Sequence, residues 1–302
     1  MNNNILNEIN DLKKKRNAVI LSHFYQRPEI QGIADFIGDS LELSRKAADT
    51  KADVVVFCGV HFMAETASIL SPDKIVLLPN IGAGCPMAEM ADYEGLKKLK
   101  EEHPEACVVS YVNTTADVKT LSDICCTSAN AVKVVNTIPK DREIIFVPDK
   151  NLGRYVEKMT GRKLILWQGY CNTHNKLTVE EVLLTKERYP NAKVIAHPEC
   201  REEVLDIADG VFSTSGMIKY VASSAAKEFI ICTEDGILHQ LQRKYLDKKF
   251  ILPSNKLICP NMKKTKIEDV LYSLANMKPE VRVSDDVREK AIIPIKRMLE
   301  IK

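Results

Sequence analysis

Apolar runs and amphipathic segments alternate along almost the whole chain. Between the runs, segments such as Leu41–Thr50, Tyr93–Glu102, Val179–Tyr189 and Ile237–Tyr245 repeat apolar residues three and four positions apart, the spacing of one helix face. Continuous apolar strands that alternate with helices are typical of parallel sheets covered on both faces, so the pattern predicts an α/β fold. The predicted strands are Ala18–Ser22, Asp53–Phe57, Lys74–Leu78, Ala106–Val112, Ile124–Thr127, Glu143–Val147, Lys163–Trp167, Lys193–His197, Gly210–Ser213, Glu228–Cys232 and Lys249–Leu252.

A pattern of polar residues and cysteines recurs three times along this series of strands. A lysine-led apolar strand, a short loop and a cysteine end at Cys85, Cys171 and Cys259, which are 86 and 88 residues apart. His23, Tyr111 and His197, at three strand ends, are 88 and 86 residues apart. Ser40, Ser128 and Ser215 are 88 and 87 residues apart, with Thr214 just before the last. Internal repeats of this kind indicate a fold built from similar units.

The repeat predicts three similar αβα units with short parallel sheets, arranged around a pseudo-threefold axis and a central cavity. The expected units are residues 1–87, 88–174 and 175–262, and residues 263–302 are expected to form C-terminal helices that pack back on the core. Ligands of parallel α/β sheets bind beyond the carboxyl ends of the strands. If those ends face inward, the repeated polar residues and the three cysteines converge on one cavity.

Composition narrows the function. The 302 residues include 43 Lys and Arg against 41 Asp and Glu, a net charge of +2, which argues against a nucleic-acid binder with a dominant basic patch. No apolar run approaches the roughly 18 residues of a membrane span, and the N-terminus does not resemble a secretory signal. The expected compartment is therefore the cytoplasm, where nine cysteines with no CxxC motif do not suggest a disulfide framework.

Three converging thiolates favour zinc, copper(I) or an iron–sulfur cluster. A zinc site could combine Cys85, Cys171 and Cys259 with His174, three residues after Cys171. A cubane cluster with three cysteine ligands would instead leave one iron open to act as a Lewis acid, which suits dehydration rather than electron transfer. The plain alternative is that these three cysteines are buried core residues inherited by triplication. The other six do not belong to the repeat and are expected to be core residues: Cys58, Cys107, Cys125, Cys126, Cys200 and Cys232.

The polar residues of the repeat suit a small anionic substrate. Ser40, Ser128 and Thr214 begin helical patterns, where a hydroxyl can cap the helix beside free backbone N–H groups. His23 and His197 can donate hydrogen bonds to carboxylate or phosphate and can titrate near neutrality. Glu199 is the candidate general acid or base if the cavity raises its pKa. Tyr25 and Tyr111 could donate hydrogen bonds or protons.

Motifs spread along nearly the whole chain make it resemble the A-type quinolinate synthase family of NAD biosynthesis. They are LSHFYQRPEIQ, GDSLELSRKA, GCPMAEM, YVNTTADVK, CTSANAVKVV, PDKNLGRYV, WQGYCNTH, HPEC, STSGM and CPNMK. The resemblance implies three similar αβα units around a central cavity and one [4Fe–4S] cluster on three cysteines. It also implies condensation of iminoaspartate (iminosuccinate) with dihydroxyacetone phosphate to quinolinate, with release of phosphate and water.

The resemblance also assigns residues to roles. The cluster ligands would be Cys85, Cys171 and Cys259; the substrate-binding residues would be His23, Ser40, Tyr111, Asn113, Ser128, His197, Glu199 and Thr214; and the catalytic residues would be Tyr25, Tyr111, His174 and Glu199. An iminoaspartate-producing oxidase or dehydrogenase is a further possible partner. The segment after Cys259 lacks the CxxC that could form a regulatory disulfide in some relatives.

Two other functions share some of these features. A different cluster-dependent hydro-lyase would use the open iron without a phosphate pocket. A zinc or cluster protein that senses iron or oxygen would not explain a ring of His, Ser, Thr and Glu around the same cavity.

Overall fold

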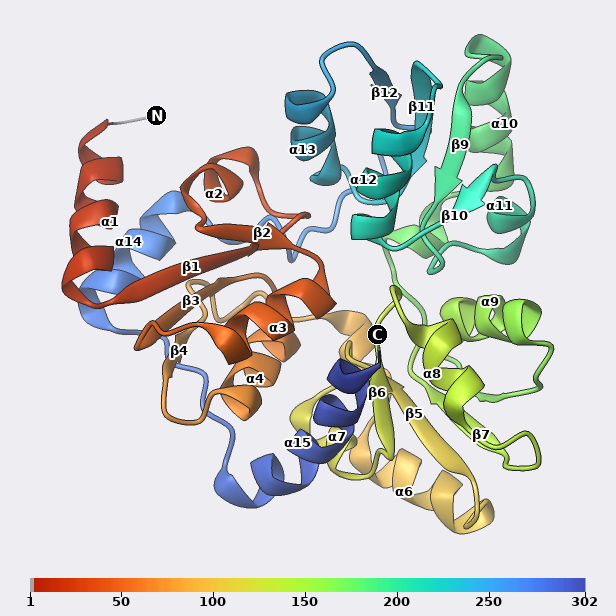
Figure 1. Cartoon of the computed structure of the whole chain (residues 1–302), viewed down its shortest axis with the longest axis horizontal. Coiled ribbons are helices and arrows are strands. Elements are labelled where there is room, and N and C mark those ends of the chain that lie inside the picture. The colour runs from red at the N-terminus through yellow and green to blue at the C-terminus, as the bar shows by residue number, and fades with distance from the viewer. Residues whose placement is uncertain (1–2, 302) are drawn as a thin grey trace.

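The computed structural model describes residues 3–301 and contains three four-stranded sheets whose neighbouring strands are all parallel (Figure 1). Each sheet has the same strand order: its first strand lies between the second and the third, and the fourth lies outside the third. Helices flank each sheet. The predicted α/β class with three similar units is therefore confirmed, whereas the unit boundaries at residues 87, 174 and 262 stay a prediction.

The sheets follow one another along the chain. The first contains β1 (Ala18–His23), β2 (Phe36–Gly38), β3 (Val54–Cys58) and β4 (Ile75–Leu77), with helices α1 (Asn3–Lys15), α2 (Pro28–Ile33), α3 (Ser40–Asp49) and α4 (His61–Leu70). The second contains β5 (Cys107–Tyr111), β6 (Ile124–Cys126), β7 (Ile144–Val147) and β8 (Ile165–Leu166), with α5 (Pro86–Glu89), α6 (Tyr93–Glu102), α7 (Ala116–Thr120), α8 (Ala131–Thr137) and α9 (Lys150–Thr160).

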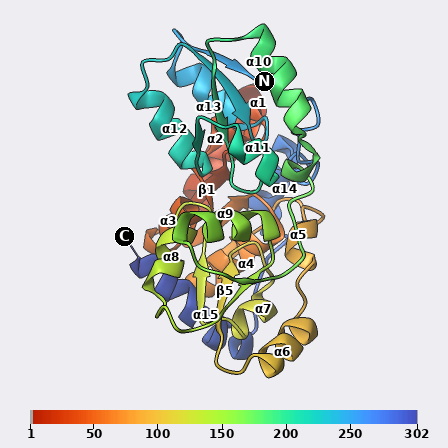
Figure 2. The same cartoon turned by 90° about the vertical axis from the view of Figure 1, so that its right-hand side faces the viewer.

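The third sheet contains β9 (Lys193–Ala196), β10 (Gly210–Val211), β11 (Glu228–Cys232) and β12 (Lys249–Ile251), with α10 (Val179–Arg188), α11 (Glu202–Asp206), α12 (Thr214–Ser223) and α13 (Ile237–Lys244). A short 3-10 helix, η1 (His174–Lys176), precedes it, and α14 (Ile267–Asn276) and α15 (Asp285–Glu300) follow it. Figure 2 shows the helices of this third sheet above those of the second. No helix within residues 3–301 is long and apolar enough to cross a membrane.

The strand sequences explain why the sheets are buried. All five residues of β3 and all four of β7 are buried, as expected where helices cover both faces. In the first sheet, His23 pairs with Gly38 and Ser22 with Cys58, so the carboxyl ends of three strands lie at one edge. Helices begin directly after these ends, so the polar loop residues there are held at a fixed edge of each sheet.

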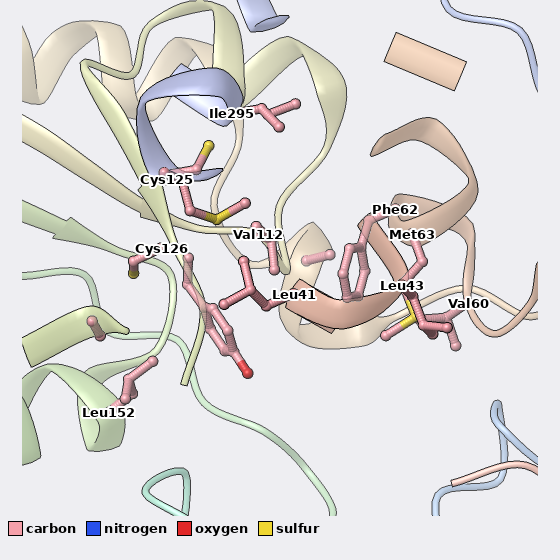
Figure 3. Close-up of a cluster of buried hydrophobic side chains, with 14 of the residues drawn as sticks. Leu41, Leu43, Val60, Phe62, Met63, Val112, Cys125, Cys126, Leu152 and Ile295 are labelled. Carbon is pink, nitrogen blue, oxygen red and sulfur yellow. The ribbon is translucent and has the colours of Figure 1, made fainter. Parts of the chain in front are cut away.

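An apolar core joins the first two sheets to the C-terminal helix. Leu41 of α3 lies beside Val112 and next to Phe62 of α4, and Cys126 and Ile295 of α15 belong to the same buried cluster (Figure 3). Helix α15 packs on α7, β6 and α4, whereas α14 packs on α1 and β3. Helix α15 therefore bridges the first and second units, whereas α14 packs on the first unit alone.

The structure corrects two details of the predicted elements. All eleven predicted strands are present, but β2 was missed because its three residues are flanked by Asp35 and Asp39 and give no apolar run. The predicted hydroxyl N-caps are wrong. Ser40 and Thr214 are the first helical residues behind the caps Asp39 and Ser213, and Ser128 lies in the turn before α8. Aspartate and the preceding serine cap instead because their side chains reach the free N–H groups two or three residues on.

Candidate active site

One cavity with about 1000 Å³ of empty space, its open mouth included, lies between the three sheets. Every residue assigned to a site from the sequence lines it: His23, Tyr25, Ser40, Cys85, Tyr111, Asn113, Ser128, Cys171, His174, His197, Glu199, Thr214 and Cys259. They come from strand ends, from the starts of helices α3 and α12, and from the loops that carry the cysteines. The inward convergence expected from the repeat is thus present, although it does not itself assign a role to any residue.

The three repeated cysteines differ from the other six. Cys85, Cys171 and Cys259 are partly exposed, whereas all the others are buried. A charge on Cys259 raises the pKa of Cys85, and one on Cys85 raises the pKa of Cys171, so the three sulfurs lie close enough to interact. Placement at a shared cavity argues against the alternative that they are only inherited core residues.

Nearby backbone N–H groups oppose the effect of burial on the pKa of each of these cysteines. Burial raises the pKa of Cys85 to about 12, even though the N–H groups of Ala88 and Met87 act to lower it. The N–H groups of Asn261 and Met262 act in the same way on Cys259, where burial again raises the pKa. The N–H of His174, three residues on, lowers the pKa of Cys171 against the effect of burial. Hydrogen bonds of this kind favour a thiolate and are used to tune iron–sulfur ligands, so the residues present fit such a cluster.

The positions of these residues fit a zinc site made of the three cysteines and His174 less well than they fit an iron–sulfur cluster. In residues 3–301, one group of three potential ligands has its atoms within 4.8 Å of one another, and it consists of Cys171, His174 and Glu199 without the other two cysteines. A tetrahedral zinc ion would require all four ligand atoms at about 2.0–2.3 Å from one point. In this structure His174 Nδ1 instead lies 3.1 Å from Cys171 Sγ and 2.8 Å from Glu199 Oε2. The wider spacing of the sulfurs favours a larger inorganic group.

A chain of hydrogen bonds ends on the Glu199 carboxylate. His174 Nδ1 lies 2.8 Å from Glu199 Oε2, and His174 Nε2 lies 2.8 Å from the Thr233 hydroxyl. Tyr25 Oη lies 2.6 Å from Thr233 Oγ1 on the other side. From the opposite side, Tyr111 Oη donates to Glu199 Oε1 at 2.7 Å. All five side chains are buried, so the chain is shielded from solvent.

The pKa of Glu199 is shifted in the direction opposite to the expected one. Burial alone would raise it, but His197 and His174 lower it, and hydrogen bonds from His174 and Tyr111 lower it further. The net effect holds the pKa below its usual range. Glu199 is therefore an ionised carboxylate, suited to accept a proton rather than to donate one.

His23 and His197 share one local geometry. The Tyr25 N–H donates to His23 Nδ1 at 3.1 Å, and the Glu199 N–H donates to His197 Nδ1 at 3.4 Å. Each neutral ring then carries its proton on Nε2; that of His197 lies 3.2 Å from Ser128 Oγ. Burial lowers both pKa values to about 3 although the Glu199 carboxylate acts to raise them, so the expected titration near neutrality is wrong.

Sequence reasoning missed several residues of the site. Thr233 and Glu234 follow β11 directly, and the strand-end rule that selected His23 and Tyr111 could have found them. Asp39, Thr173 and Lys176 also line the cavity. Ser215, one of the repeated serines, does not line it but donates to Glu42 Oε2 at 2.6 Å.

The fold and the cavity define an α/β enzyme with a thiol-bearing active site at the meeting point of three parallel sheets. The chain belongs to the family described as quinolinate synthetase A protein, whose model matches residues 7–300. This confirms the family expected from the motifs, and iron–sulfur dependence is a property of that family.

Curated relatives cover nearly the full length. A quinolinate synthase of Desulforudis audaxviator is 54% identical over 97% of each chain. Quinolinate synthase 1 of Methanosarcina acetivorans is 56% identical over 99% of this chain and 98% of its own. A quinolinate synthase of Geobacter metallireducens is 56% identical over 98% of this chain and 97% of its own.

The histidine geometry makes a prediction about protonation. At pH 5, an ordinary histidine with a pKa of about 6.5 is mostly charged, whereas His23 and His197, with pKa values of about 3, should stay neutral with the proton on Nε2. Two-bond ¹H–¹⁵N correlation spectra measure this directly, with His23→Gln and His197→Gln used for assignment. An imidazolium pattern for either ring at pH 5 would contradict the assignment.

Proposed function

We propose that this chain condenses iminoaspartate with dihydroxyacetone phosphate to form quinolinate, with release of phosphate and water. The observation that supports the proposal most strongly is that all thirteen residues assigned to the site from the sequence line one cavity. The chain that carries them belongs to the quinolinate synthetase A family. The reaction joins two small anions through C–C and C–N bonds and involves no net redox change.

We assign Cys85, Cys171 and Cys259 as ligands of one [4Fe–4S] cluster. Three cysteine ligands leave one iron without a protein ligand. When bound, the cluster supplies a Lewis acid at that iron, able to hold a carboxylate or a leaving hydroxyl. Their placement at one cavity and the nearby backbone N–H groups that favour their thiolate forms support this assignment.

The surrounding polar residues are suited to hold the anionic groups of the substrates. Ser40 and Thr214 are the first residues of two ten-residue helices, at the ends where the helix dipole favours negative charge. Ser128 and Asn113 line the cavity beside them. His23 and His197 bind as neutral Nε2–H donors, because their low pKa values keep them uncharged. Hydrogen bonding, rather than full positive charge, then selects carboxylate and phosphate.

Proton transfer is assigned to the hydrogen-bonded chain. Glu199 accepts a proton from the bound intermediate, and Tyr111 holds the other oxygen of that carboxylate. His174 and Tyr25, linked through Thr233, hold protons that can be returned during ring closure. Burial of these groups keeps water from imine and enamine intermediates, which hydrolyse readily.

The proposal extends to the setting of the enzyme. An open iron is preserved best in a reducing compartment, so we place the protein in the cytoplasm. Because iminoaspartate is unstable in water, an oxidase or dehydrogenase that forms it from an amino acid would be the natural supplier.

Cysteine replacement tests the cluster ligands. Cys85→Ala, Cys171→Ala and Cys259→Ala should each lose the broad visible absorbance of the cluster and quinolinate formation, because one ligand is removed. Cys107→Ala, which alters a buried strand cysteine, is the matched control and should retain both. A brown and active Cys171→Ala protein, measured after anaerobic purification, would disprove the ligand assignment.

Replacement of the buried carboxylate tests the proton acceptor. Glu199→Gln should keep the cluster spectrum but lower kcat for quinolinate formation by about 10²–10⁴-fold, the usual range for loss of a general base. Glu203→Gln, on the exposed side of α11, should leave kcat unchanged. Wild-type turnover in Glu199→Gln would remove this residue from the mechanism.

A further inference from the structure

A buried ion pair lies beside the third cysteine and has no part in the proposed chemistry. Lys263 Nζ lies 2.9 Å from Glu234 Oε1, with side chains 14% and 0% exposed. Glu234 follows β11 and lines the cavity, and Lys263 lies four residues after Cys259. Burying two opposite charges is costly, so such a pair is weak evidence for stability and calls for another explanation.

The Glu234 carboxylate accepts hydrogen bonds from two backbone segments, one at Cys259 and one at Gly236. Its Oε1 accepts from the Cys259 N–H at 3.0 Å, and its Oε2 accepts from the Gly236 N–H at 2.8 Å. The carboxylate therefore ties the loop that carries the cysteine to the loop that leads into α13. Removing it would leave the Cys259 N–H without a partner in a nearly closed environment.

Lys263 connects the Glu234 carboxylate to Tyr25, in the loop that follows strand β1 of the first sheet. Its Nζ donates to the Tyr25 backbone oxygen at 2.8 Å and also lies 2.7 Å from Asp235 Oδ1. The Lys263 N–H donates to the Cys259 oxygen at 3.2 Å. The ion pair thus links a cysteine on one wall of the cavity to Tyr25 on another.

The second sheet has a related arrangement. Asp149 occupies the same place after β7 that Glu234 occupies after β11, two residues beyond the last strand residue. It is fully buried and caps α9 through Oδ1, whereas its Oδ2 has no hydrogen-bond partner. The first sheet carries Val60 at this place. A buried carboxylate at this strand-end position therefore occurs in two of the three sheets, and the one beside Cys259 accepts from the cysteine N–H.

We propose that Glu234 and Lys263 are positioning residues that hold Cys259 in place to bind the cluster and fix its distance from Tyr25. This inference rests on the proposed cluster ligands and goes beyond them, because neither residue is itself a ligand. Outer partners of metal ligands commonly affect metal affinity by 10–100-fold.

The test measures how fast the cluster is lost from the full-length protein. Wild type, Glu234→Gln, Lys263→Met and the double variant are loaded anaerobically, and iron transfer to the chelator ferrozine is followed over time. Each single variant should release iron at least about tenfold faster than wild type. The double variant should lose less than the product of the two single effects, because no unpaired buried charge remains. Lys263→Arg, which keeps the charge, should restore slow release.

The matched control is Lys256→Met. Lys256 lies three residues before Cys259 and forms a half-exposed ion pair with Glu181 at 3.0 Å, away from the cavity. The Lys256→Met variant should release iron at the wild-type rate. Thermal unfolding midpoints of the apo proteins identify a general loss of folding: a purely structural pair would lower the midpoint without a specific effect on iron release.

The outcomes separate this inference from the proposed function. Iron release from Glu234→Gln and Lys263→Met at the rate of Lys256→Met, from a wild type that holds a cluster, overturns the positioning role alone. Faster release that simply follows a lowered unfolding midpoint also overturns it. A wild-type protein that takes up no cluster overturns both this inference and the proposed ligands.

Discussion

The buried carboxylate of Glu199 is the constraint on which the arrangement of the site depends. A charge with 3% exposure persists only when the protein supplies hydrogen bonds, and those bonds come from different parts of the chain. Tyr111 comes from the end of β5, His174 from the segment before the third sheet, and Tyr25, through Thr233, from the loop after β1. The hydrogen bonds that satisfy this one carboxylate, directly or through His174 and Thr233, therefore connect residues from all three units at the cavity.

The threefold repeat explains why three of the nine cysteines lie at the cavity. The three at equivalent places in the repeat lie at the cavity with nearby backbone N–H groups that favour their thiolate forms, whereas the remaining six are buried. Backbone donors are set by the local turn and need no particular side chain, so triplication of one unit could produce three of them at once. The three sheets differ in the residue two positions after the third strand, which is Val60 in the first, Asp149 in the second and Glu234, bonded to the Cys259 N–H, in the third.

The sequence predicted most of the fold and the lining of the cavity. Apolar periodicity located eleven strands, and the 86–88-residue spacing brought His23, Tyr111 and His197 to one place, because strand ends in parallel sheets share an edge. The environments of individual side chains could not be predicted in the same way. The low pKa values of His23 and His197 and the ionised state of Glu199 arise from burial and from partners distant in sequence. Thr233 carries no motif of its own and gains its place only through contacts with Tyr25 and His174.

The central claim is that three cysteines from a threefold repeat hold one iron–sulfur cluster at the cavity. The most direct test is the iron, acid-labile sulfide and zinc content of the anaerobically purified, reconstituted chain, compared with the triple variant in which Cys85, Cys171 and Cys259 are alanine. The account predicts about four iron and four sulfide per wild-type chain, as a [4Fe–4S] cluster requires, and neither in the variant. One zinc per chain with no sulfide, or equal iron and sulfide in both proteins, would contradict it.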